Sequence, residues 1–135
     1  MINTFDIDGV INMGEYRGLR LERNDIIITG RSIEEEGYTV KWLRERGIYN
    51  QIFFNNIPYN MKTRELSGWH KASTIKLLQS YGLELGIHFE DDPVQADIIE
   101  KETTIKVVRI IHDLVEKENV WHGDTNDSAS TGFIR

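Results

Sequence analysis

The 135-residue sequence contains no cysteine and only two prolines, and no apolar run in it approaches the length that crosses a bilayer. The absence of cysteine excludes disulfides, thiolate metal ligands and a cysteine nucleophile. The amino terminus reaches acidic residues at once, instead of showing the basic stretch and apolar core of a signal peptide. These absences are compatible with a reducing compartment, and we expect a cytoplasmic protein that does not enter membranes.

The chain does have an excess of negative charge and an ordinary content of apolar residues. Its formal net charge is −6, so the surface as a whole does not attract nucleic acid or anionic lipid, and any phosphate must be bound by local charges. The hydrophobic content of 39% and the length are typical of one globular domain. We expect this domain to span residues 1–122, followed by a flexible tail over residues 123–135, which is rich in small polar residues.

Short β-rich runs alternate with helical patterns along the chain, which is typical of a parallel sheet covered by helices. The predicted strands are residues 2–7, 25–29, 51–54, 87–90 and 106–111. The segment between Asp8 and Asp25 is too short for a helical crossover, so we expect a loop or a hairpin there. The sequence therefore predicts an α/β fold with about five parallel strands and flanking helices.

Cap signals indicate where the helices begin. Ser32 and Glu35 form a capping-box pattern directly after the second predicted strand. A second helix is predicted from about residue 67, with apolar residues at helical spacing. Pro93 suits the first turn of a third helix, with Asp92 before it as a candidate cap.

Four polar clusters lie beside the predicted strand ends or at a helix start. They are Asp6-Ile7-Asp8-Gly9, Thr29-Gly30-Arg31, Lys71 and Glu90-Asp91-Asp92. The carboxyl ends of parallel strands face one crevice, so these residues should converge although they are distant in sequence. Several carboxylates in one crevice repel each other unless a cation compensates, and magnesium prefers such oxygen ligands. The sequence therefore predicts a magnesium site, with Lys71 beside it to attract an anion.

This set resembles the four motifs of the haloacid dehalogenase-like superfamily, in the same order, over roughly residues 2–111. The family's first motif, Asp-x-Asp-Gly, is matched by residues 6–9, and its last, an acidic pair after a strand, by residues 91–92. The resemblance implies a three-layer, Rossmann-like domain. It also implies a magnesium-dependent phosphatase that hydrolyses phosphomonoesters through an aspartyl-phosphate intermediate.

Catalytic roles follow from the resemblance position by position. Asp6 would be the nucleophile, and Asp8 would protonate the leaving oxygen and then activate the hydrolytic water. Thr29 and Lys71 would bind and neutralise the phosphoryl group. Magnesium would be held by Asp6, by the backbone carbonyl of Asp8 and by the final acidic pair, Asp91 and Asp92, with Asp91 favoured as the direct ligand.

Family members usually carry a cap domain that selects the substrate, and neither gap between the motifs here has room for one. An open site favours a nucleotide or a nucleic-acid end phosphate over a small metabolite. The phosphatase module of polynucleotide kinase-phosphatases offers a weak analogy, since it also has a Gly-Arg after the second motif. By this analogy, Gly30 and Arg31 would bind the substrate. Assembly into an oligomer stays open.

Each residue also has a structural interpretation. Lys71 alone could be one more exposed lysine, Asp92 only a helix cap, and Glu90 a strand-end carboxylate without a metal role. The order of the motifs argues against a receiver domain, which has its acidic pair first and its lysine last. The alternative function is a non-catalytic phosphate-binding or regulatory protein on the same fold.

Overall fold

The computed structural model describes residues 1–114, and its centre is a five-stranded parallel sheet in the order β3-β2-β1-β4-β5. The strands are β1 (Ile2–Phe5), β2 (Ile26–Ser32), β3 (Ile52–Asn55), β4 (Leu85–Glu90) and β5 (Lys106–Arg109). Every neighbouring pair runs parallel. The predicted α/β architecture is therefore confirmed, while the expected tail and the domain boundary at residue 122 lie outside the described residues.

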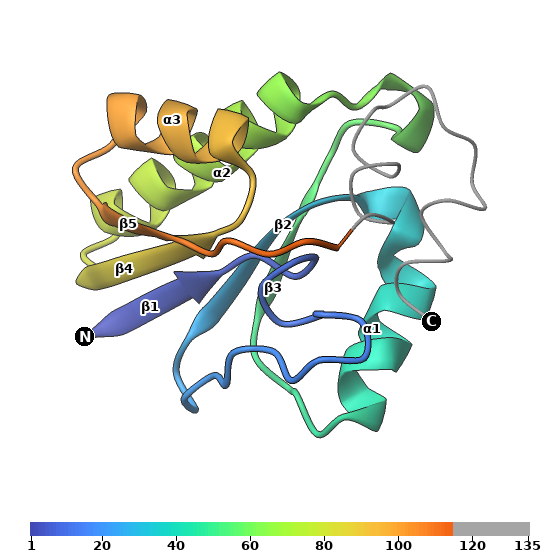
Figure 1. The fold of residues 1–135 in the computed structure, drawn as a ribbon. Helices are drawn as coiled ribbons and strands as arrows, with labels where there is room; N and C mark the ends of the chain where they lie inside the picture. The colour runs from blue at the N-terminus through green and yellow to red at the C-terminus, as the bar shows by residue number, and fades with distance from the viewer. Residues whose placement is uncertain (115–135) are drawn as a thin grey trace.

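Helices cover both faces of the sheet (Figure 1). Helices α2 (Arg64–Ser80) and α3 (Pro93–Glu102) pack on one face, and α1 (Glu36–Glu45) lies on the other. The isoleucines of β2 explain the three layers, because successive side chains on a strand point to opposite faces. Ile26 and Ile28 pack against α2 and α3, whereas Ile27 belongs to the core beneath α1. Full burial of such a side chain stabilises the fold by about 1.5–3 kcal/mol.

The helix starts follow their caps. Ser32 and Glu35 form the predicted capping box, which begins a 3-10 turn that leads into α1. The predicted start of α2 was too late in the chain: the side chain of Thr63 accepts a hydrogen bond from the backbone N–H of Leu66, so the helix begins at Arg64 rather than near residue 67.

Two segments differ in informative ways from the regular pattern. Strand β2 continues past Thr29 to Ser32, because Ser32 pairs with Asn55 of β3 after a shift in register. Between Asp8 and Asp25 the chain forms no helix and no named strand, as predicted.

The topology brings the predicted site to one edge. Strands β2, β1 and β4 are neighbours in the sheet, so the residues that follow β1 and those that end β2 and β4 lie together. Within residues 1–114 no second domain covers this edge. The described helices also include none that is both long and apolar enough to cross a membrane.

Candidate active site

Lys71 lies between two carboxylates at the carboxyl edge of the sheet. Its Nζ is 3.0 Å from Oδ1 of Asp6, which follows β1, and 2.8 Å from Oε1 of Glu90, the last residue of β4. The Lys71 side chain is fully buried, so its alternative interpretation as an exposed lysine is wrong. Lys71 lies two turns inside α2 rather than at its start, so side chains rather than helix-end amides surround its charge.

Burial and attraction act in opposite directions on Lys71. Burial alone would lower the pKa of its ammonium group, but the charges and hydrogen bonds of Asp6 and Glu90 outweigh burial, so the pKa is raised. Lys71 is therefore a permanent cation at any physiological pH.

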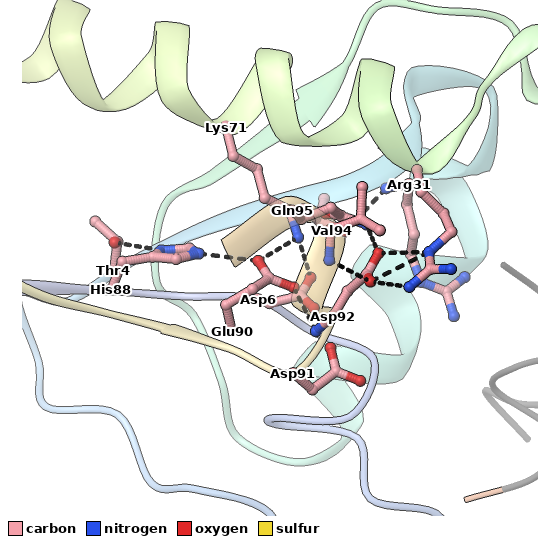
Figure 2. A network of polar contacts seen from close by, with 12 residues as sticks. Thr4, Asp6, Arg31, Lys71, His88, Glu90, Asp91, Asp92, Val94 and Gln95 are labelled. Carbon is pink, nitrogen blue, oxygen red and sulfur yellow. Dashed lines mark hydrogen bonds and ion pairs between the residues drawn. The ribbon is translucent and has the colours of Figure 1, made fainter. Parts of the chain in front are cut away.

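His88 supports this arrangement from inside the sheet, as Figure 2 shows. Its Nε2 lies 3.0 Å from Oε1 of Glu90 and its Nδ1 lies 2.7 Å from Oγ1 of Thr4. Complete burial, together with the charge of Lys71, lowers the pKa of His88 to about 3, so the ring is neutral. A neutral ring satisfies both contacts when Nε2 donates to Glu90 and Nδ1 accepts from the Thr4 hydroxyl. We call Asp6, Lys71, His88 and Glu90 the Lys71 cluster.

Asp91 joins the cluster from the loop after β4. Oxygen atoms of Asp6, Glu90 and Asp91 lie within 4.8 Å of one another. Oδ2 of Asp91 also lies 2.7 Å from Nε2 of His112. Gly9 permits this approach, because its φ is +85° and a Cβ at that position would lie 2.1 Å from Oδ2 of Asp91.

The three carboxylates are a set that suits a hard divalent cation. Lys71 contributes one positive charge beside Asp6 and Glu90, and His112 contacts Asp91. Magnesium accepts such oxygen ligands, usually one or two carboxylates, and keeps other positions for water and a substrate phosphate. The donor set therefore fits such an ion, which Asp6, Glu90 and Asp91 could hold.

Asp8 belongs to a second buried network on the β2 side. Its Oδ1 accepts a hydrogen bond of 2.8 Å from Nη2 of Arg31, and Nη1 of Arg31 lies 3.4 Å from Oε1 of Glu35. Oε2 of Glu35 accepts in turn from Nζ of Lys62 at 3.0 Å. All four side chains are at least nine-tenths buried, with exposures between 2% and 7%. We call Asp8, Arg31, Glu35 and Lys62 the Arg31 cluster.

Asp92 is engaged in holding α3. Its carboxylate accepts hydrogen bonds from the backbone N–H of Val94 and from the side chains of Arg64 and Gln95. Burial acts to raise the pKa of Asp92, but the bonds and charge of Arg64 dominate, so the pKa is lowered. The predicted cap is confirmed, and the carboxylate predicted as a magnesium ligand is not part of the acidic group that Asp91 joins.

The remaining predicted residues lie along β2. Thr29 is buried, and its Oγ1 accepts a hydrogen bond of 3.0 Å from the backbone N–H of Arg31. Gly30 lies between them in the strand. Arg31 was predicted to bind substrate, and the structure directs its guanidinium group to Asp8 and Glu35.

Three residues with contacts at this site had no functional assignment from the sequence. His88 and Glu90 are two residues apart in β4, so they project from the same face of the strand. Two polar residues at that spacing in an otherwise apolar strand were the available signal. Glu35 was identified only as a cap, because its contacts with Arg31 and Lys62 depend on how distant segments meet.

Models of known protein families, curated proteins and solved structures were each compared with the chain, and none of them matches it.

Proposed function

We propose that this chain is a magnesium-dependent phosphomonoester hydrolase that works through an aspartyl-phosphate on Asp6. The observation that carries the proposal is the convergence of Asp6, Lys71 and Asp91 at one edge of the sheet, with Asp8 two residues beyond Asp6. Three carboxylates whose oxygen atoms lie within 4.8 Å of one another can hold a cation, and a cation together with an ammonium group can bind a phosphate.

The two carboxylates have different roles, Asp6 as the nucleophile and Asp8 as the general acid and base. In the first step an oxygen of Asp6 forms a bond to phosphorus, the ester P–O bond breaks, and Asp8 in its protonated form gives its proton to the departing oxygen. In the second step water attacks the phosphorus atom and Asp8 takes its proton, which releases phosphate and restores Asp6. When bound, magnesium would supply positive charge to the phosphoryl oxygens.

Lys71 keeps the nucleophile in place during both steps. Its Nζ contacts Asp6 and Glu90 together, and Glu90 is held in turn by His88. Because each of these side chains is almost completely buried, the carboxylate of Asp6 has few alternative positions. Such preorganisation lowers the cost of reaching an in-line geometry.

The substrate class rests on the absence of a cap domain in the described part of the chain. A site without such a domain favours a phosphate at the end of a larger molecule. We therefore extend the proposal to nucleotides and nucleic-acid end phosphates. A small phosphorylated metabolite is the less favoured substrate.

The test is phosphate release from an aryl phosphate, several nucleotides and a 3′-phosphorylated oligonucleotide, each with magnesium or with a chelator. We expect release that requires magnesium and is lost in Asp6→Asn. The matched control is Asp97→Asn, since Asp97 is an exposed aspartate on α3 whose partner is Arg109. Release that persists in Asp6→Asn would contradict the aspartyl-phosphate route. No release from any compound, with magnesium still raising the unfolding temperature, would favour the non-catalytic alternative.

A further inference from the structure

We propose that Glu35 is a positioning residue for Asp8 and that it acts through Arg31. The inference rests on the proposed function, in which Asp8 is the proton donor. It adds a residue that no motif assigns. It also gives Glu35 a role beyond the helix cap, through its contact with the buried Arg31.

Arg31 is held at both ends of its guanidinium group. Nη2 donates to Asp8 at 2.8 Å, and Nη1 lies 3.4 Å from Glu35. A guanidinium group is planar and rigid, so the position of one nitrogen determines the position of the other. The orientation of the Asp8 carboxylate therefore depends on where Glu35 holds Arg31.

Glu35 is itself firmly anchored. Its Oε2 accepts from the backbone N–H of Ser32 at 2.8 Å and from Lys62 at 3.0 Å, and its Oε1 accepts from the hydroxyl of Tyr38 at 2.8 Å. These donors come from the end of β2, the first turn of α1 and the segment before α2. A carboxylate with three anchors can act as a fixed support for Arg31.

The charge of Glu35 also matters for Asp8. Burial lowers the pKa of Lys62, whereas the charges of Glu35 and Asp8 act to raise it. The ammonium group of Lys62 therefore interacts electrostatically with both carboxylates. Glu35 binds Lys62 directly and leaves Asp8 paired with Arg31. Without the Glu35 charge, two buried cations would compete for Asp8, and its carboxylate would lose its single orientation.

Two aryl phosphates of similar size can distinguish a misplaced Asp8 from general damage to the fold. Departure of 4-nitrophenolate needs little protonation, whereas departure of phenolate benefits from a proton donor, so only phenyl phosphate reports on a well-placed Asp8. In Glu35→Gln, the amide oxygen can still accept from Ser32, so the cap is preserved while the charge is lost. We expect kcat/KM for phenyl phosphate to fall by about tenfold and that for 4-nitrophenyl phosphate to change by less than about twofold.

Lys62→Gln provides a second variant that leaves the capping box intact. With Lys62 neutral, Glu35 draws Arg31 toward itself, so the same selective loss should appear at about threefold. The matched control is Glu36→Gln, one residue further along at an exposed position. It should leave both substrates unaffected.

The outcomes separate the positioning role from the proposed function. An equal loss for both substrates, or no loss in either variant, would overturn the positioning role while native magnesium-dependent hydrolysis still stood. If Glu35→Gln does not fold, the Lys62→Gln comparison tests the role by itself, and a selective loss there supports it. If the native chain hydrolyses neither compound, the proposed function fails, and the positioning role fails with it.

Discussion

The Lys71 cluster and the Arg31 cluster are both buried at the carboxyl edge of one sheet, yet their charges balance differently. In the Arg31 cluster two cations face two carboxylates. In the Lys71 cluster one ammonium group faces two carboxylates, and Asp91 adds a third acid beside it, while His88 is neutral. Like charges in a low-dielectric interior are costly unless a cation lies beside them. This difference in charge underlies the two proposals, metal binding at the Lys71 cluster and positioning of Asp8 in the Arg31 cluster.

Removal of Lys71 should have the largest effect. Lys71→Met leaves Asp6 and Glu90 buried against each other, and we expect a loss of about 3–5 kcal/mol in the free energy of unfolding, measured by urea denaturation without magnesium. Lys62→Met should cost less, because Glu35 keeps its contacts with Arg31 and Ser32. The control Lys76→Met, at a half-exposed surface pair, should cost less than about 1 kcal/mol. Equal costs for Lys71 and Lys62 would remove the contrast between the clusters.

Magnesium itself should distinguish the clusters next. At 100 times its dissociation constant, a cation that binds only the folded state stabilises it by about 2.7 kcal/mol. We expect this gain in the native chain and its loss in Asp91→Asn, measured as the magnesium-dependent rise in unfolding free energy. Asp8→Asn should retain the gain, because the Asp8 carboxylate is bound to Arg31. A gain that survives in Asp91→Asn and disappears in Asp8→Asn would reverse the assignment.

The pH dependence of stability tests the field of Lys71 at its neighbour His70. Burial first, and the charge of Lys71 second, lower the pKa of His70 from its ordinary value of 6.5 to about 4. As the pH falls below 6.5, the unfolded chain binds this proton before the folded chain does, so folding is destabilised progressively until about pH 4. From pH 7 to pH 5 the loss attributable to His70 is about 2 kcal/mol.

His70→Gln should remove that part of the acid destabilisation and leave the rest. The comparison requires unfolding free energies of both proteins at pH 7 and pH 5. Identical pH dependences would contradict a lowered pKa at His70, whether burial or Lys71 is its cause.

The smallest effect is expected outside both clusters, at Asp92. Asp92→Ser keeps a cap for α3 but loses the contacts with Arg64 and Gln95, so we expect a loss of about 1 kcal/mol in unfolding free energy. The magnesium-dependent gain should persist, in contrast to Asp91→Asn. Its loss in Asp92→Ser would return Asp92 to the metal site.

Local sequence signals predicted much of the secondary structure correctly. The isoleucines of β2, the capping box at Ser32 and the cap at Asp92 each depend on a few neighbouring residues, and the structure confirms all three. Strand and helix ends were less certain, since β2 extends to Ser32 through pairing with Asn55 of another strand. That pairing depends on register, which no short segment specifies.

The sequence by itself determined the α/β alternation and the set of polar residues at the ends of its elements, because periodicity, caps and strand ends are local properties. Only the tertiary structure decided which of these residues contact one another as hydrogen-bonded or ion pairs. Thr4 meets His88 across 84 positions and Arg31 meets Asp8 across 23, and such contacts arise from strand order and packing. The same packing separated Asp91 from Asp92, two identical side chains adjacent in sequence: Asp91 lies beside Asp6 and Glu90, whereas Asp92 contacts Arg64.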